Sequence, residues 1–225
     1  ARPRSCAAAA RTRFFLCLKT NPLEGRGIVV TRPRERARAL AAMIEAAGGT
    51  ALVFPALEIE EPADARPALA LIDRLEEFEM AIFVSPNAVE RAMRLVRARR
   101  GGRPWPRGLS VAAIGRGSRR ELERQGFAGV IAPRAGADSE ALLALPAFED
   151  VSGKRVLIFR GEGGRELLGA GLAARGASVE YAQCYRRVHS RVDSAPLAAA
   201  LARGAVHAVT VSSSEGLVGL HERLD

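Results

Sequence analysis

Two short apolar runs decide the fold, Ile28-Val29-Val30 and Val156-Leu157-Ile158, because the same order of features follows each of them. Each run is followed by an arginine, then a stretch with helical spacing, a glycine and a second apolar run. Arg32 corresponds to Arg160 and Gly48 to Gly176, at a constant offset of 128 residues. Agreement over this length without a gap indicates an internal repeat.

Each copy predicts a strand, a loop, a helix and a second strand. In the first copy the helix opens at 32–35 and ends at Gly48-Gly49, before a strand at 51–54. In the second copy a loop at Arg160-Gly161 precedes a helix over 167–174 and a strand over 179–181. Alternating strands and helices predict parallel sheets covered on both faces, with ligands at the carboxyl ends of the strands.

The 128-residue offset continues at two serines. Each of them follows an apolar run of the kind that forms a buried strand. Ser85 comes after the strand at 81–84, and Ser213 comes 128 residues later, after 209–211. Serine is a preferred N-cap, and the free N–H groups at a helix start bind anions. These serines are therefore predicted to cap helices, and their duplication also fits a ligand site.

A further strand at 111–114 leads into the turn Gly115-Arg116-Gly117-Ser118, a helix from Arg119 to Gln125 and a strand at 130–131. Its counterpart would occupy positions 237–261, beyond Asp225. We therefore expect the C-terminal element of the second unit to be missing from this chain.

Composition limits the class of protein. The 225 residues are 48% hydrophobic and carry a net charge of +9, of which +4 lies in residues 1–24. That basic leader is expected to be disordered, either an upstream extension of the reading frame, which we favour, or a transit peptide. No run approaches the roughly 18 apolar residues of a membrane span.

The remaining charge favours anionic ligands. Three cysteines without CxxC spacing favour a reducing compartment, and three scattered histidines indicate no metal site. The loop Gly161-Glu162-Gly163-Gly164 departs from the dinucleotide pattern GxGxxG. No nucleophile elbow, zinc motif or phosphate loop occurs, so any chemistry must need few groups.

Several motifs together resemble the uroporphyrinogen-III synthase family, and they cover roughly residues 26–225. They are Phe83-Val84-Ser85-Pro86-Asn87-Ala88-Val89, Ala113-Ile114-Gly115, Phe159-Arg160-Gly161 with Arg165, Cys184-Tyr185-Arg186 and Val211-Ser212-Ser213-Ser214. The resemblance implies an α/β fold of two flavodoxin-like lobes with parallel sheets, joined by a two-stranded linker with crossings at 55–61 and 182–188. The first lobe would combine 26–56 with 187–225, the second would hold 57–186, and the substrate would lie in a cleft between them.

This resemblance also implies an activity, that of a cyclising hydro-lyase of heme biosynthesis. Such an enzyme closes hydroxymethylbilane, a linear tetrapyrrole with eight carboxylates, to uroporphyrinogen III, with inversion of the last ring and loss of water. No cofactor is used. A cytoplasmic monomer without nucleic-acid or membrane partners is expected. The alternative is a non-catalytic basic regulatory or anion-binding module of two lobes.

The resemblance assigns Tyr185 as the proton donor to the leaving hydroxyl. An octacarboxylate requires many N–H donors and positive charge, which arginines and loop amides supply. The predicted substrate-binding residues are Arg32, Ser85, Asn87, Gly115, Ser118, Arg160, Gly161, Arg186, Ser212 and Ser213. Arg116 departs from the family, where a small polar residue is common.

Overall fold

A computed structural model describes residues 21–164 and 166–224, and the chain divides into two compact units. Unit 1 combines the described residues up to Pro55 with those from Val192 onward, and unit 2 is Ala56–Arg191. Residues 1–20 of the expected leader, and Arg165, lie outside the described residues.

The expected disorder of residues 1–24 is wrong for residues 21–24, which form a turn against unit 1. The Leu23 amide donates to the Ala47 carbonyl at 3.0 Å, and the Leu23 side chain packs against the small core of this unit. A leucine that buries its side chain in this way fixes the chain locally.

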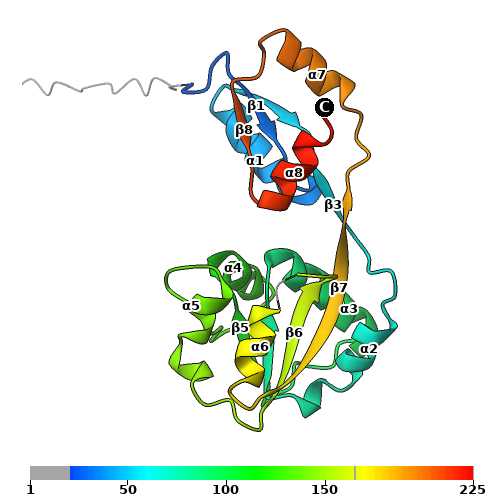
Figure 1. Ribbon diagram of the computed structural model, residues 1–225, viewed down its shortest axis with the longest axis vertical. Coiled ribbons are helices and arrows are strands. Elements are labelled where there is room, and N and C mark those ends of the chain that lie inside the picture. The colour runs from blue at the N-terminus through cyan, green and yellow to red at the C-terminus, as the bar shows by residue number, and fades with distance from the viewer. Residues whose placement is uncertain (1–20, 165, 225) are drawn as a thin grey trace, which may run out of the picture. The chain divides into compact units, whose positions relative to one another are not determined.

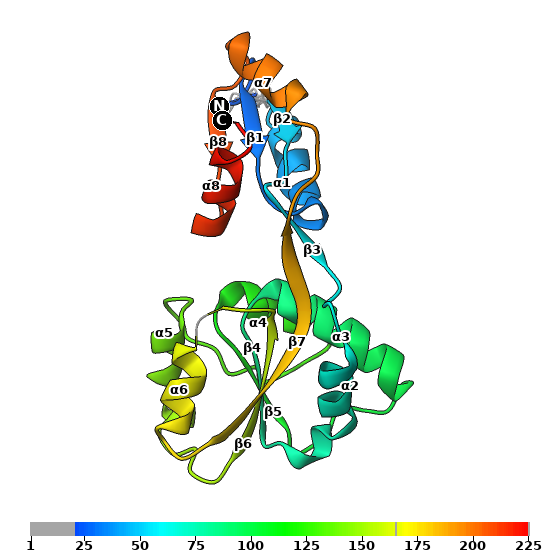
Figure 2. The same cartoon turned by 45° about the vertical axis from the view of Figure 1, so that its right-hand side comes forward.

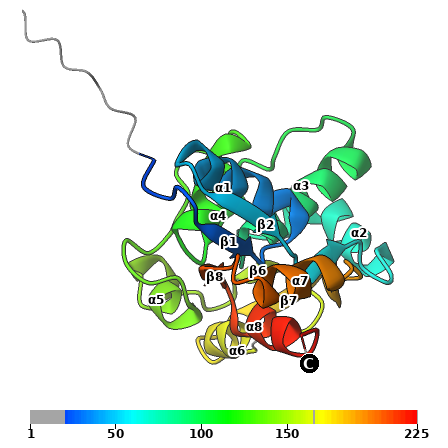
Figure 3. The ribbon, with the colours of Figure 1, turned by 90° about the horizontal axis from the view of Figure 1, so that it is seen from above.

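Unit 1 is a three-stranded parallel sheet with strand order β2-β1-β8. Figure 3 shows α1 on one side of these strands and α7 and α8 on the other. Ile28 and Val30 of β1 pack against Ala37 and Ile44 of α1. The elements are β1 (Gly27–Val30), α1 (Arg34–Ala46), β2 (Thr50–Val53), α7 (Ala195–Ala202), β8 (Ala208–Thr210) and α8 (Ser214–His221).

The outer edge of unit 1 carries exposed apolar side chains. Among the described residues, β8 pairs only with β1. Val209 and Val211 remain 44% and 41% exposed, and Leu217 and Val218 of α8 are each 54% exposed. One edge of β8 and one side of α8 are therefore uncovered by the described part of the chain.

Unit 2 contains a five-stranded sheet with strand order β3-β7-β6-β4-β5 (Figure 1). Its strands are β3 (Leu57–Glu60), β4 (Met80–Phe83), β5 (Ser110–Ala113), β6 (Arg155–Gly161) and β7 (Ser178–His189). Its helices are α2 (Arg66–Asp73), α3 (Pro86–Arg100), α4 (Arg116–Arg124), α5 (Ser139–Leu143) and α6 (Leu167–Ala173), with short 3-10 turns η1 (Leu75–Glu77) and η2 (Pro146–Phe148).

Both faces of this sheet are buried, as the continuous apolar runs predict. Along β4, Ala81 and Phe83 join the cluster formed with α2, α3 and α4, whereas Met80 and Ile82 join the cluster formed with α5 and α6. This alternation follows the two-residue period of a strand. Figure 2 shows α2 and α3 on one side of the strands and α5 and α6 on the other.

The chain enters and leaves unit 2 through neighbouring strands. β3 pairs antiparallel with the end of β7, with Leu57 opposite His189 and Glu60 opposite Arg186. Beyond the ladder, the Ser190 amide donates to the Ala56 carbonyl at 3.2 Å. β7 thus stays in unit 2 up to residue 189, although the predicted second lobe ends at 186.

The strand positions follow the offset seen in the sequence. β6 begins 128 residues after β1, β7 begins 128 after β2, and β8 begins 128 after β4.

Three local predictions are wrong. Arg160-Gly161 is not a loop, because β6 stays paired with β7 as far as Gly161. Residues 116–118 are not a turn, because α4 begins at Arg116, and the run 130–131 forms only an isolated bridge between Ile131 and Ala112. The helices α2, α5 and α7 were not predicted.

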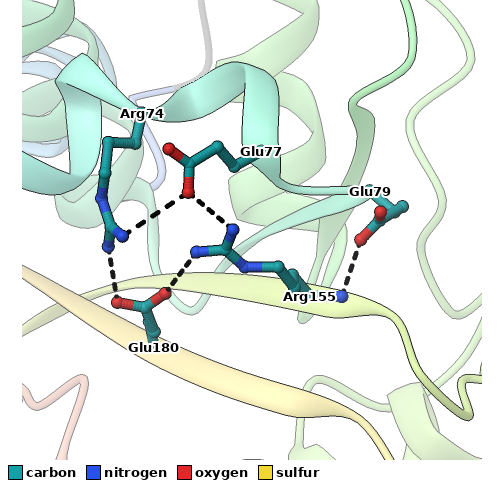
Figure 4. Close-up of polar contacts among 5 residues, drawn as sticks. All are labelled: Arg74, Glu77, Glu79, Arg155 and Glu180. Carbon is teal, nitrogen blue, oxygen red and sulfur yellow. Dashed lines mark hydrogen bonds and ion pairs between the residues drawn. The ribbon is translucent and has the colours of Figure 1, made fainter.

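An ion-pair ring links η1 to the starts of β6 and β7, at the amino-terminal edge of the sheet (Figure 4). Arg74 contacts Glu77 at 3.5 Å and Glu180 at 2.9 Å, and Arg155 contacts the same two carboxylates at 2.6 and 3.1 Å. The Arg155 amide also donates to Glu79 at 2.7 Å. The ring thus fixes the strand ends at one edge of the sheet, and the predicted site lies at the opposite edge.

Candidate functional site

Two predicted site residues from distant parts of the chain meet at the carboxyl ends of the strands of unit 2. The Ser85 hydroxyl lies 3.1 Å from the Tyr185 hydroxyl, and either can donate. Ser85 is also the N-cap of α3, where its Oγ accepts the Ala88 amide at 2.9 Å. A serine that follows β4 and begins α3 is thereby placed beside a tyrosine of β7.

Tyr185 is fully buried, and its ring is fixed by the neighbouring strand. It belongs to the core cluster that includes Phe83 and Phe159. A Cβ atom on Gly161 would lie 2.7 Å from Cε2 and Cζ of this ring. Gly161, which was predicted to bind substrate, therefore has a second role: because it lacks a side chain, the Tyr185 ring can occupy the space beside it.

Arg187 is a site residue that the sequence analysis missed. Its Nη2 donates to the Tyr185 hydroxyl at 3.3 Å, and its guanidinium carbon lies 5.7 Å from the centroid of the Tyr185 ring. Arg187 is exposed, unlike Tyr185. Residues two apart on a strand share a face, so the two-residue period was a signal that could have found it.

Arg160 lies in unit 2 but directs its guanidinium into the protein. The residue is 6% exposed. Its Nε donates to the Gly163 carbonyl at 2.9 Å, its Nη1 pairs with Glu166 at 3.2 Å, and it lies over the Tyr181 ring at 4.9 Å. These contacts hold the loop that follows β6.

Arg186, also predicted, lies where β7 pairs with β3. Its Nη2 donates to Glu60 at 2.8 Å across the ladder. Its Nε is buried and has no hydrogen-bond partner within the described parts of the chain. The guanidinium thus joins the two crossing strands, with its side chain 43% exposed.

The predicted residues of the Gly115 loop divide between exposed and buried positions. Gly115 is the N-cap residue of α4, with extended backbone, and it packs against Ala137. Ser118 is 2% exposed inside α4, so its hydroxyl does not face solvent. The predicted residue Asn87 is not part of this loop. It lies half-buried in the first turn of α3, near Ser85.

In unit 1 the structure brings together Arg32, Ser212 and Ser213. Arg32 follows β1 and the serines follow the adjacent strand β8, and all three are exposed. Ser213 caps α8, and its Oγ accepts the Gly216 amide at 3.1 Å. The Thr31 hydroxyl, another missed contact, donates to the Thr210 carbonyl at 2.7 Å and fixes these strand ends together.

Burial also changes the acidity of groups beside the site on β7. Burial raises the pKa of the Cys184 thiol to about 12, with a smaller contribution from Glu61. The pKa of Tyr181 is raised by burial and by the nearby Glu166 carboxylate. Both groups are protonated at neutral pH, and neither supplies a nucleophile.

The described residues hold no group of three His, Cys, Asp or Glu side chains arranged for a metal ion. No helix in the described ranges is long and apolar enough to cross a membrane.

Residues 38–225 match the family model for uroporphyrinogen-III synthase HemD. The chain is 35% identical over 190 residues to the uroporphyrinogen-III synthase of Salmonella typhimurium, and the match covers 84% of this chain and 76% of that protein. Identity to the Escherichia coli enzyme of the same name is 36% over 191 residues, with the same coverage.

Solved structures agree at the level of the fold. A mutant uroporphyrinogen III synthase from Thermus thermophilus superposes with a TM-score of 0.60 at 21% identity, over 88% of this chain and 76% of that chain. The mixed α/β fold with parallel sheets is thus confirmed.

Proposed function

The chain belongs to the uroporphyrinogen-III synthase family, and we propose that it converts hydroxymethylbilane into uroporphyrinogen III as a cyclising lyase. The observation that carries the mechanism is the hydroxyl pair of Ser85 and Tyr185, which lies where the strands of unit 2 end. The family match favours this enzyme over the non-catalytic anion-binding module. A cytoplasmic monomer without a cofactor remains our prediction.

We interpret the two units as flavodoxin-like lobes that share a repeated strand-helix unit. The 128-residue offset between strand starts supports this interpretation, and so do the matching N-caps Ser85 and Ser213. Each serine leaves the other N–H groups of its helix start available to an anion. Substrate carboxylates would bind such donors together with exposed arginines, of which Arg32 and Arg187 are our first choices.

We assign Tyr185 and Ser85 to one proton path. Tyr185 is fully buried, so its proton would reach the substrate through a partner that is less buried. Ser85 is half-buried and lies 3.1 Å away. In this path Tyr185 donates its proton to Ser85 while Ser85 donates its own to the hydroxyl of hydroxymethylbilane, whose C–O bond breaks so that the hydroxyl leaves as water. The proton released when the ring closes would return to Tyr185 by the same path.

Arg187 and Arg160 would have different parts in the reaction. The Arg187 guanidinium holds the Tyr185 hydroxyl in place from the exposed side, where it can also meet a carboxylate. Arg160 is a positioning residue for Gly163 and Glu166, because its donors are turned toward them.

Replacement of Tyr185 by phenylalanine tests the proton path. Tyr185→Phe should lower turnover by roughly 10²-fold or more, the usual range for general acid catalysis, while substrate affinity changes little. Because hydroxymethylbilane also cyclises unaided, the assay must measure the ratio of isomer III to isomer I. Ser85→Ala should give a similar loss.

The chain provides matched controls for both variants. Tyr181→Phe removes the only other tyrosine hydroxyl, on the same strand but beside Glu166, and should leave turnover within about threefold of normal. Ser213→Ala removes the equivalent N-cap of α8. Near-normal turnover and isomer ratio for Tyr185→Phe would show that catalysis depends on substrate folding instead.

A further inference from the structure

A cavity lies in unit 2, and neither Ser85 nor Tyr185 lines it. It has a volume of about 280 Å³ and lies between the end of α3, the loop before β5 and the residues after α4. Because α3 and α4 begin at the carboxyl ends of the strands, their last turns lie toward the opposite edge of the sheet. The lining residues are Met93, Val96, Arg97, Gly102, Arg103, Trp105, Gln125, Gly126 and Phe127.

Aromatic rings form one wall of this cavity. Trp105 and Phe127 meet edge to face, with centroids 5.0 Å apart and planes at 87°. The indole N–H donates to the Leu109 carbonyl at 3.1 Å, which fixes the orientation of the ring. Met93 and Val96 are each 7% exposed and form the floor. Such a surface suits a planar apolar group.

The rim of the cavity is basic. Arg97 and Arg103 are exposed, and no acidic residue is among those that line the cavity. Arg97 donates through Nη2 to the Gln125 side chain, which uses only part of its five N–H donors. Among the described residues Arg103 makes no close ion pair, and it acts on Asp73 and Glu76 only through its charge.

The nearby acids make their close ion pairs with arginines outside the cavity lining, although the charge of Arg103 also acts on both of them. Asp73 is held by Arg99 at 2.7 Å, and Glu76 by Arg100. The mouth is also open, because a Cβ atom on Gly102 or Gly126 would meet nothing within 4 Å. An apolar floor, a fixed aromatic wall and two guanidinium groups thus surround one opening.

We propose that this cavity binds a small aromatic dicarboxylate, with its ring against Trp105 and Phe127 and its carboxylates on Arg97 and Arg103. Guanidinium groups bind carboxylates through paired hydrogen bonds, and the volume suits a single ring with short acidic arms. The site is separate from the proposed proton path, so its occupancy can be measured without any assay of turnover.

Trp105 is the only tryptophan of the chain, so its fluorescence reports occupancy directly. Titration of the intact protein with 1,2-phenylenediacetate should change Trp105 emission with a saturable curve. Arg103→Gln should weaken binding about tenfold, the usual effect of losing a hydrogen bond to a charged group. The neutral 1,2-phenylenediacetamide should bind at least about tenfold more weakly.

Arg107→Gln is the matched control, because it removes the same charge from the same loop at a residue that does not line the cavity. It should change affinity by less than about twofold. In two-dimensional NMR spectra the amides of Gly102 and Gly126 should shift on titration. Absence of a saturable emission change, equal weakening by Arg103→Gln and Arg107→Gln, or amide shifts only elsewhere would each overturn the proposal.

Discussion

Gly161 shows how the absence of one side chain shapes the proposed site. Its φ is not in the left-handed region, so alanine suits the backbone, but the added Cβ would lie 2.7 Å from the Tyr185 ring. Gly161→Ala should destabilise the protein by about 1–3 kcal/mol, as overpacking does, and separate Tyr185 from Ser85. Denaturant unfolding measures the first effect and the isomer ratio the second.

Gly108→Ala is the control for this prediction. Gly108 also lies outside the left-handed region, and a Cβ atom there would meet nothing within 4 Å. Equal unfolding midpoints for the two alanine variants would contradict a contact between Gly161 and the Tyr185 ring.

At the same scale, the sequence predicted the site residues better than their contacts. Tyr185 came from the family resemblance, but its partner Ser85 is 100 residues away, and no local pattern gives that distance. Arg160 was assigned to the substrate because arginine binds carboxylates. Its burial depends on Glu166 and the Gly163 carbonyl, which only the folded loop brings together.

At the scale of elements, the end of α3 is anchored by a buried arginine. Arg100 is 7% exposed and pairs with Glu76 of η1, and this contact lowers the pKa of Glu76 to about 2. A lowered pKa contributes stability that is present above the unfolded value and lost as pH falls toward 2. Glu76→Gln should therefore be less stable than the parent at pH 7, and the difference should shrink below about pH 5.

Unfolding in denaturant at several pH values between 7 and 3 would measure this effect, with each midpoint compared to the parent. Glu140→Gln, at an exposed residue of the first turn of α5, removes the same charge without a partner arginine in the described ion pairs. A stability difference for Glu76→Gln that stays constant with pH would contradict the assignment.

Element boundaries were harder to predict than elements. The starts of β1, β2 and α1 agreed with the sequence pattern to within one or two residues, because Pro33 and the glycines give clear signals. α4 begins at Arg116, earlier than predicted, since Gly117 and Ser118 are poor helix formers whose preference is overridden by packing of Ser118 and Leu122. β6 is longer than its apolar core because β7 continues to pair with it.

For the whole molecule, the division of the chain gives a testable consequence. Unit 2 is one continuous segment with both hydrophobic clusters of its sheet, and its ends meet where Ser190 bonds to Ala56. A protein of residues 56–191 should therefore fold alone and unfold cooperatively. Dispersed NMR amide signals and a single thermal transition would be the expected result.

A protein of residues 21–55 is the natural comparison, because it contains β1 and β2 but lacks β8 and should remain unfolded. If residues 56–191 gave only the collapsed amide signals of an unfolded chain, the second unit would depend on the first.

The strand order of unit 1 also determines when that unit can form during synthesis. β1 and β2 leave the ribosome first, but β8 pairs with β1 only after the whole of unit 2 has been made. At roughly 5–20 residues per second, the intervening stretch of about 150 residues takes on the order of 10–30 seconds. During that interval one edge of β1 has no neighbour, so the nascent chain must keep an unpaired strand from aggregating while its second half is still being translated.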